Sequence, residues 1–195
     1  MSVYLVRHPP TPWTGVRYLG RRDLGWSEAG RRRAGELAVG LAPRIDRSGL
    51  VITSPLRRSH ALAEQLAAAT GCAIEVDERW TEVDVGAIEG ATFAEFEARE
   101  PMLARRVAGG ALTIDWPAGE RFAELERRVA VGFDEATARP ESPLVIVTHA
   151  GPIAVLLSRL GCHGDTRFVR PASVLALGLT TDGRWEIQPL RMRAR

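Results

Sequence analysis

Three short apolar segments, rich in β-branched residues, constrain the fold of this chain more than any other feature. They occupy residues 3–6, 50–53 and 144–147, and helical patterns of apolar residues lie between them. Buried strands that alternate with amphipathic helices are typical of parallel sheets covered by helices on both faces. We therefore expect a three-layer α/β/α fold around a mostly parallel central sheet.

Polar residues follow each of these segments at the point where the strand should end. In chain order, they are Arg7, His8, Arg57 and His149. Because ligands of open α/β sheets bind outside the carboxyl ends of the strands, we expect these four side chains to meet at one edge of the sheet. Arg58 and His60 are interpreted as ordinary surface residues.

Two arginines and two histidines suit an anion that carries more than one negative charge, and phosphate fits that description. Arginine presents a planar fork of donors that matches phosphate oxygens, and a neutral imidazole can act as a nucleophile. Pro9 and Pro10 cannot continue a strand, so His8 should sit at a rigid exit. Arg57 lies in the first turn of a helix predicted over residues 56–69, where backbone N–H groups also favour anions.

The order of these motifs resembles the histidine phosphatase superfamily, also called the phosphoglycerate-mutase-like family. The matching motifs are Arg7-His8, Ser54-Pro55-Leu56-Arg57 and Thr148-His149-Ala150-Gly151. Further matches in the family's order are Thr11, Trp13, Gly20, Asp23, Gly30 and the segments 82–90 and 117–120. The resemblance covers most of the chain and implies a fold of the phosphoglycerate-mutase type.

The resemblance implies a metal-independent phosphomonoester hydrolase that works through a phosphohistidine intermediate on His8. Arg7, Arg57 and His149 would hold the phosphate oxygens. Thr14 stands where the family often has an asparagine that touches the phosphate. The resemblance implies neither a metal nor another cofactor.

A proton donor for the leaving group is expected within residues 79–90, an irregular apolar segment with three carboxylates. Charge alone does not separate Glu82 from Asp84. The resemblance selects Glu82 as the proton donor.

Residues 91–121 resemble the short helical lid that covers the pocket in this family. A capping box that begins at Thr92 and a proline at position 101 predict two short helices there. Apolar residues at positions 122, 125, 129 and 133 recur at helical spacing and predict a long helix that begins near Gly119. The stretch Tyr-x-Gly-x-x-Asp-Leu at residues 18–24 and Pro-x-Gly-Glu at residues 117–120 are similar to α-ribazole phosphatases of cobalamin synthesis. They make α-ribazole 5′-phosphate a candidate substrate. Pro9 and Pro10 replace the family's usual Gly-Glu, which leaves the substrate contacts of this loop open.

The length of 195 residues predicts one domain over residues 1–195. The net charge of +2 does not call for a nucleic-acid partner, and no apolar stretch approaches the roughly 20 residues that cross a bilayer. We expect a cytoplasmic protein whose partner is a small phosphorylated substrate, with a homodimer left open. Cys72 and Cys162 show no metal-like spacing and are interpreted as reduced packing residues.

Two other functions compete with phosphomonoester hydrolysis. A phosphoglycerate-type mutase would return the phosphoryl group to its substrate, but mutases of the family tend to carry longer segments over the pocket. A non-catalytic phosphate-binding relative would be expected to have lost His8 or Glu82, and this chain has both.

Overall fold

The computed structural model of the chain describes residues 2–162 and 169–190. The strands in this part are β1 (Ser2–Arg7), β2 (Leu50–Thr53), β3 (Ala73–Val76), β4 (Leu144–Thr148), β5 (Val174–Leu179) and β6 (Trp185–Gln188). The α-helices are α1 (Glu28–Leu41), α2 (Arg57–Thr70), α3 (Phe93–Arg99), α4 (Pro101–Ala108), α5 (Phe122–Thr137) and α6 (Ala150–Arg159). Short 3₁₀ helices cover Ala42–Arg44, Glu78–Trp80 and Gly86–Ile88.

The described strands form one mixed sheet in the order β3-β2-β4-β1-β5-β6. The first four strands of this order run parallel, and β5 and β6 form an antiparallel hairpin beside β1. In the register of the sheet, Arg7 lies opposite Thr148 and Thr53 lies opposite Val147. The carboxyl ends of the three predicted strands therefore meet at one edge, as expected.

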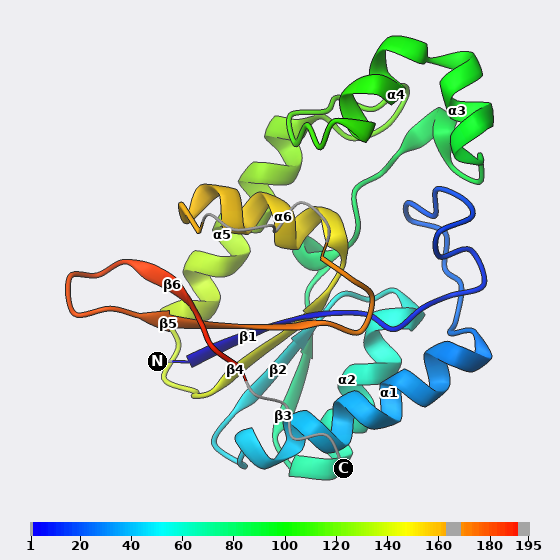
Figure 1. The fold of residues 1–195 in the computed structure, drawn as a ribbon. Coiled ribbons are helices and arrows are strands. Elements are labelled where there is room, and N and C mark those ends of the chain that lie inside the picture. The colour runs from blue at the N-terminus through cyan, green and yellow to red at the C-terminus, as the bar shows by residue number, and fades with distance from the viewer. Residues whose placement is uncertain (1, 163–168, 191–195) are drawn as a thin grey trace.

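Helices cover both faces of the sheet, which confirms the predicted three-layer α/β/α fold (Figure 1). Alternate residues of each strand point to opposite faces, as the pleat of a strand requires. Leu144 and Ile146 of β4 join a core with α5 and α6, whereas Val145 and Val147 join a core with α1 and α2. A strand with apolar residues on both faces is buried on both, so the unbroken apolar runs in the sequence are explained.

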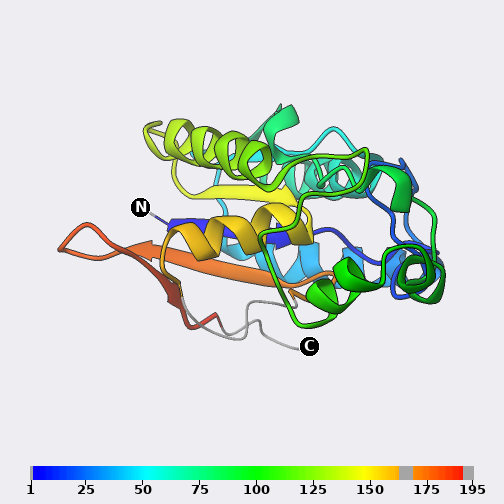
Figure 2. The ribbon, with the colours of Figure 1, turned by 90° about the horizontal axis from the view of Figure 1, so that it is seen from above.

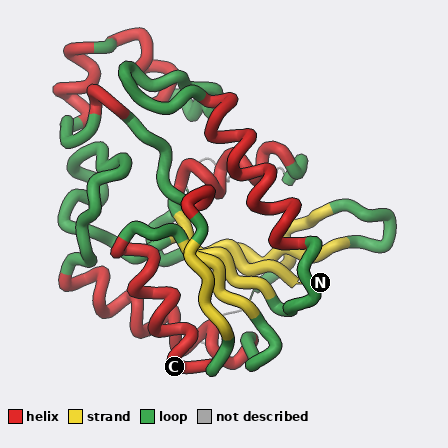
Figure 3. The backbone as a smooth tube through the Cα atoms, turned by 180° about the vertical axis from the view of Figure 1, so that it is seen from behind, coloured by secondary structure: helices red, strands yellow, loops and turns green. Residues whose placement is uncertain are grey.

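Helices α3 and α4 lie apart from the sheet, at the end opposite the tip of the β5–β6 hairpin (Figures 2 and 3). They have their own small core, which includes Val85, Ile88, Phe96 and Ala104. Thr92 forms the predicted capping box at the start of α3, and Pro101 is the first residue of α4. Among the described residues, no helix is both long and apolar enough to cross a bilayer.

Two predicted helix starts differ from the structure. Helix α2 begins at Arg57 with Leu56 as its N-cap, because the Ser54 hydroxyl bonds instead to His149 and to the backbone N–H of Leu56. Helix α5 begins at Phe122 and not near Gly119, because Gly119 belongs to a turn in which its N–H donates to the carbonyl of Trp116. Both differences arise from polar contacts of the residues just before the helix, which helical periodicity does not report.

Candidate active site

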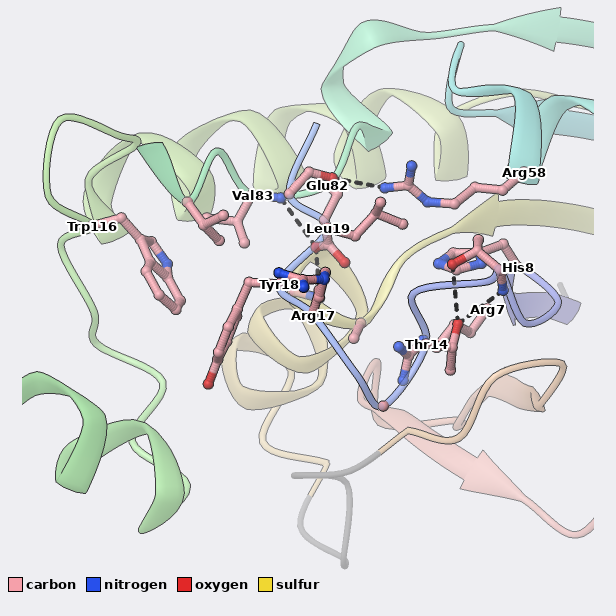
Figure 4. Close-up of a pocket in the computed structure, with 16 residues that line it drawn as sticks. Arg7, His8, Thr14, Arg17, Tyr18, Leu19, Arg58, Glu82, Val83 and Trp116 are labelled. Carbon is pink, nitrogen blue, oxygen red and sulfur yellow. Dashed lines mark hydrogen bonds between the residues drawn. The ribbon is translucent and has the colours of Figure 1, made fainter. Parts of the chain in front are cut away.

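A cavity of about 330 Å³ opens at the carboxyl edge of the sheet. Side chains from distant parts of the chain line it, and Figure 4 shows how they converge. Its ionisable lining residues are Arg7, His8, Arg17, Tyr18, Arg58 and Glu82. The first turn of α6 also contributes Ala150 and Gly151, so a helix N-terminus adds partial positive charge to this wall.

His8 lies at this cavity with its ring almost wholly buried, at 3% exposure. Its Nδ1 lies 2.7 Å from the carbonyl oxygen of Pro9, which can only accept a hydrogen bond, so Nδ1 carries the proton. Burial, followed by the charges of Arg58 and Arg7, holds the pKa of His8 well below its ordinary value. His8 is therefore a neutral imidazole with a free lone pair on Nε2, which is the form that a nucleophile needs.

His149 is adjacent to His8, with ring centroids 5.0 Å apart, but it is fully buried and lies behind the residues that line the cavity. The Nε of Arg58, an obligate donor, lies 3.2 Å from Nδ1 of His149. Nε2 of His149 therefore carries the proton and donates to the Ser54 hydroxyl over 2.8 Å. The structure brings His149 to His8 as predicted. Both ring nitrogens of His149 are hydrogen-bonded within the protein, to Arg58 and to Ser54.

The expectation that Arg57 joins the cavity is wrong, and Arg58 takes that position. Arg57 is exposed, and its backbone N–H donates to Asp23. Arg58 is 1% exposed and lines the cavity. Besides its bond to His149, the Arg58 guanidinium donates to the carbonyls of Arg22 and Gly20 at 2.7 and 2.8 Å.

The helical spacing of α2 contains the signal that would have identified Arg58. Arg58, Leu62 and Leu66 recur every fourth residue and form the buried stripe of the helix, whereas Arg57 lies off that stripe. Three of the five guanidinium N–H groups of Arg58 are used within the described protein, so two are left for a ligand. Burial lowers the pKa of Arg58 from its ordinary value, and the charges of Glu82 and Asp23 partly oppose this effect.

Arg7 ends β1 at the cavity, as predicted. One terminal nitrogen donates to the carbonyl of Val169, and its buried Nε has no hydrogen-bond partner among the described residues. Burial lowers the pKa of this guanidinium, and the charge of Glu82 partly opposes that effect. A buried donor without a partner is costly, and an anion in the cavity would satisfy it.

Glu82 also reaches the cavity. Its Oε1 accepts hydrogen bonds from the backbone N–H groups of Val83 and Gly151, both at 3.0 Å, while Oε2 has no hydrogen-bond partner in the described part of the chain. A Cβ atom at position 151 would lie 2.6 Å from Oε1, so the glycine permits this approach. Asp84, the other candidate, does not line this cavity, and its carboxylate accepts from the N–H of Gly86.

Thr14 lines the cavity, and its hydroxyl accepts the backbone N–H of Thr11 at 2.9 Å. The sequence interpretation missed the apolar wall opposite the cationic residues. This wall consists of Tyr18, Leu19, Val83, Val85 and Trp116. These residues come from loops without periodic pattern, so nothing in the sequence marked them as a group. Within the described ranges 2–162 and 169–190, no cluster of three or more His, Cys, Asp or Glu residues could hold a metal ion.

Known proteins are similar to this chain in sequence and in fold. A bifunctional protein of Mycobacterium tuberculosis is 38% identical over 155 residues, which are 78% of this chain but only 42% of that protein. A protein of Erwinia tasmaniensis named as a probable phosphoglycerate mutase is 30% identical over 164 residues, covering 82% of this chain and 74% of that protein.

A solved mycobacterial glucosyl-3-phosphoglycerate phosphatase, in a complex with VO3, superposes with a TM-score of 0.83 at 27% identity and covers 98% of this chain and 99% of its own. Residues 3–191 match the family described as the histidine phosphatase superfamily (branch 1). This match confirms the predicted family. The chain belongs to the histidine phosphatase superfamily, branch 1.

Proposed function

We propose that this chain hydrolyses small phosphomonoesters through a phosphohistidine on His8, without a metal ion. The observation that carries the proposal is the contact of His8, whose Nδ1 lies 2.7 Å from the Pro9 carbonyl oxygen. This contact places the ring proton on Nδ1 and leaves the lone pair on Nε2 for attack. Arg7, Arg58 and the N-terminus of α6 supply positive charge around the cavity. Phosphoryl transfer needs mainly positioning and charge stabilisation, which these groups can provide.

In the first step, Nε2 of His8 attacks phosphorus, and the bond between phosphorus and the ester oxygen breaks. The leaving alkoxide takes a proton from the carboxyl group of Glu82, whose Oε2 has no partner among the described residues. In the second step, Glu82 accepts a proton from water as the water oxygen attacks phosphorus. The P–N bond breaks, and neutral His8 and inorganic phosphate result.

The cavity wall supports a substrate whose leaving group carries a ring or another apolar body. Tyr18 and Trp116 pack against each other at the cavity, with ring centroids 5.9 Å apart, and Val83 and Val85 continue this apolar surface. We include α-ribazole 5′-phosphate among the candidate substrates, because its base would fit such a wall. Glucosyl-3-phosphoglycerate is a further candidate, on the similarity to the mycobacterial phosphatase.

We further propose that residues 91–121 cover this cavity as a lid within a single domain. Trp116, at the cavity, packs against Phe96 of α3 with ring centroids 5.8 Å apart, so the wall and these helices share one aromatic contact. The proposed partner is a small phosphorylated substrate, and a homodimer stays open.

A labelling experiment tests the proposed intermediate. With a ³²P-labelled phosphomonoester in EDTA, rapid quenching should trap acid-labile, alkali-stable label on the wild-type chain. His8→Ala should abolish both the label and turnover. His60→Ala is the matched control, because His60 is a partly exposed histidine of α2 that does not line the cavity.

The same experiment separates the competing functions. We would incubate the chain with a panel of phosphomonoesters that includes α-ribazole 5′-phosphate, glucosyl-3-phosphoglycerate and both phosphoglycerates. The proposed hydrolase should release inorganic phosphate from at least one of them. Transfer of label between phosphoglycerates, without release of phosphate, would identify a mutase. Binding of phosphate with no turnover on the whole panel would identify a non-catalytic relative, and either result would refute the proposed hydrolase.

A further inference from the structure

We infer that Glu120 and Arg128 form a positioning pair that holds Glu82 at the cavity for proton transfer. This inference rests on the proposed function, and it assigns work to two residues that do not line the cavity. Neither residue needs to touch the substrate, because their contacts run to the backbone that carries Glu82.

Arg128, on α5, holds the segment that leads into Glu82. One terminal nitrogen donates to the carbonyls of Arg79 and Thr81 at 2.6 and 2.7 Å. The other donates to the carbonyl of Glu82 itself at 3.3 Å. A planar guanidinium can reach three carbonyls at once because its donors have fixed directions, and a lysine ammonium in its place could not reproduce this pattern.

Glu120 fixes the guanidinium from the other side. Its two carboxylate oxygens accept from Nε and from the terminal nitrogen of Arg128 at 2.6 and 2.9 Å, so the pair is bidentate. Glu120 is 8% exposed, and the two residues together form a largely buried ion pair. Two parallel charge-assisted bonds restrict the orientation of the guanidinium more than a single contact would.

Glu120 also anchors the chain on the far side of Glu82. Its backbone N–H donates to the carbonyl of Asp84 at 2.9 Å, and its carboxylate accepts from the N–H of Asp84 at 3.3 Å. Arg21 adds a bond to the Glu82 carbonyl at 3.2 Å and an ion pair with Glu120 at 3.4 Å. The backbone of Glu82 is therefore held on both sides by groups that converge on one buried carboxylate.

The two glutamates have different chemical environments. Although burial opposes it, the hydrogen bonds and charge of Arg128 lower the pKa of Glu120, so Glu120 stays ionised. An ionised carboxylate bound to arginine balances the guanidinium charge and does not deliver a proton. Of the two carboxylates, that of Glu82 keeps one oxygen without a hydrogen-bond partner among the described residues, so proton transfer belongs to Glu82 and not to Glu120.

Loss of the pair should affect the step that needs a proton donor. A misplacement of about 1 Å can cost roughly 100-fold in rate. Arg128→Lys should therefore lower kcat/KM for an alkyl phosphate by about 10- to 100-fold. For p-nitrophenyl phosphate, whose leaving group needs no proton, kcat/KM should change by less than about threefold. We compare kcat/KM because it reports the steps up to the phosphohistidine, whereas kcat also contains its hydrolysis, in which Glu82 serves both esters alike.

The experiment measures kcat and KM of wild type, Arg128→Lys and Glu120→Gln on both esters, with thermal melting to verify folding. Arg127→Lys is the matched control, because Arg127 is the exposed neighbour on the same helix and its side chain has no hydrogen bond to a described residue. Glu120→Gln preserves shape and should show the same dependence on the leaving group if Arg128→Lys fails to fold.

A double-variant test links the pair to Glu82. If Arg128 acts through Glu82, then Arg128→Lys should cause no further loss on the alkyl ester in a Glu82→Gln background. An equal loss of kcat/KM on both esters, or full additivity with Glu82→Gln, would overturn the positioning role while leaving the hydrolase intact. A wild-type chain without turnover or label would refute the proposed function and this inference together.

Discussion

Arg57 and Arg58 are neighbours in the sequence, yet they lie in different environments. Arg57 is exposed at the start of α2, whereas Arg58 is buried among backbone carbonyls and His149. The strand end correctly predicted a guanidinium at this position, and only the helical phase decides which of the two residues supplies it. The arginine that reaches the cavity is thus the one that lies on the buried face of the helix.

A matched pair of substitutions tests this assignment. Arg58→Lys keeps the charge but removes the fork of donors, and we expect kcat to fall by about 10²–10³-fold, as for other groups that stabilise transition-state charge. Arg57→Lys should stay within about twofold of wild type, because surface substitutions of this kind change little. Steady-state kinetics on one phosphomonoester give the comparison, and a larger loss from Arg57→Lys would reverse the assignment.

The residues of the cavity differ in how far the sequence predicts them. Arg7, His8 and His149 could be predicted because strand ends of a parallel sheet share one edge. The partners of Glu82 could not, because Gly151 and Arg128 reach it from elements far along the chain. Polar contacts between irregular segments have no period, so only the folded chain reveals them.

At the scale of elements, the backbone of residues 84–87, which follow Glu82, packs against the backbone of residues 117–120, which precede α5. Gly86 has φ of +50°, and a Cβ atom there would lie 2.3 Å from the Pro117 carbonyl oxygen. A Cβ atom on Gly119 would lie 2.4 Å from the Asp84 carbonyl oxygen. The N–H of Ala87 donates to the Pro117 carbonyl at 2.8 Å, which closes this contact. Both glycines are therefore required for the close packing of residues 84–87 against residues 117–120, which also brings Glu120 to Asp84.

Substitution of Gly86 tests this contact. Gly86→Ala should lower the free energy of unfolding by at least about 1–2 kcal/mol, since a left-handed conformation is costly for alanine and the turn must also move. Gly35→Ala in α1 is the control, because no atom lies within 4 Å of its added Cβ, and alanine should stabilise the helix by up to about 1 kcal/mol. Urea unfolding of the two variants provides the measurement, and equal effects would contradict the argument.

Elements of regular structure were predicted more completely than the segments between them. Residues 144–147 were recognisable as a strand because they are apolar on both faces, and α3 and α4 were recognisable from their first residues. The start of α5 was not, because Asp115 accepts the N–H of Phe122 from outside the helical period. The local pattern of apolar residues predicts that a helix or strand is present, whereas hydrogen bonds to residues outside the element determine where it begins and ends.

For the molecule as a whole, the two buried histidines make stability depend on pH. Burial is the main cause that holds the pKa of both His8 and His149 well below the ordinary value of 6.5. Below pH 6.5 the unfolded chain binds protons at these two residues that the folded chain does not. The free energy of unfolding should therefore fall as the pH drops below 6.5, by up to about 1.4 kcal/mol per pH unit for each histidine.

Urea unfolding between pH 7.5 and pH 5 measures this dependence. His149→Gln should reduce the slope below pH 6.5 by up to about 1.4 kcal/mol per pH unit, whatever its effect on stability at pH 7.5. A slope unaffected by His149→Gln would show that this imidazole is not the group that resists protonation.

The strand that carries Arg7 pairs with β4 and β5, which both come from the last third of the sequence. A nascent chain on the ribosome must therefore hold β1 without β4 or β5 until synthesis has passed residue 144, and its open edges are surfaces to which other chains can bind. Contacts so distant in sequence fold slowly. The proposed phosphate chemistry must consequently wait for these strands, so a translation product that stops before β4 should have no activity.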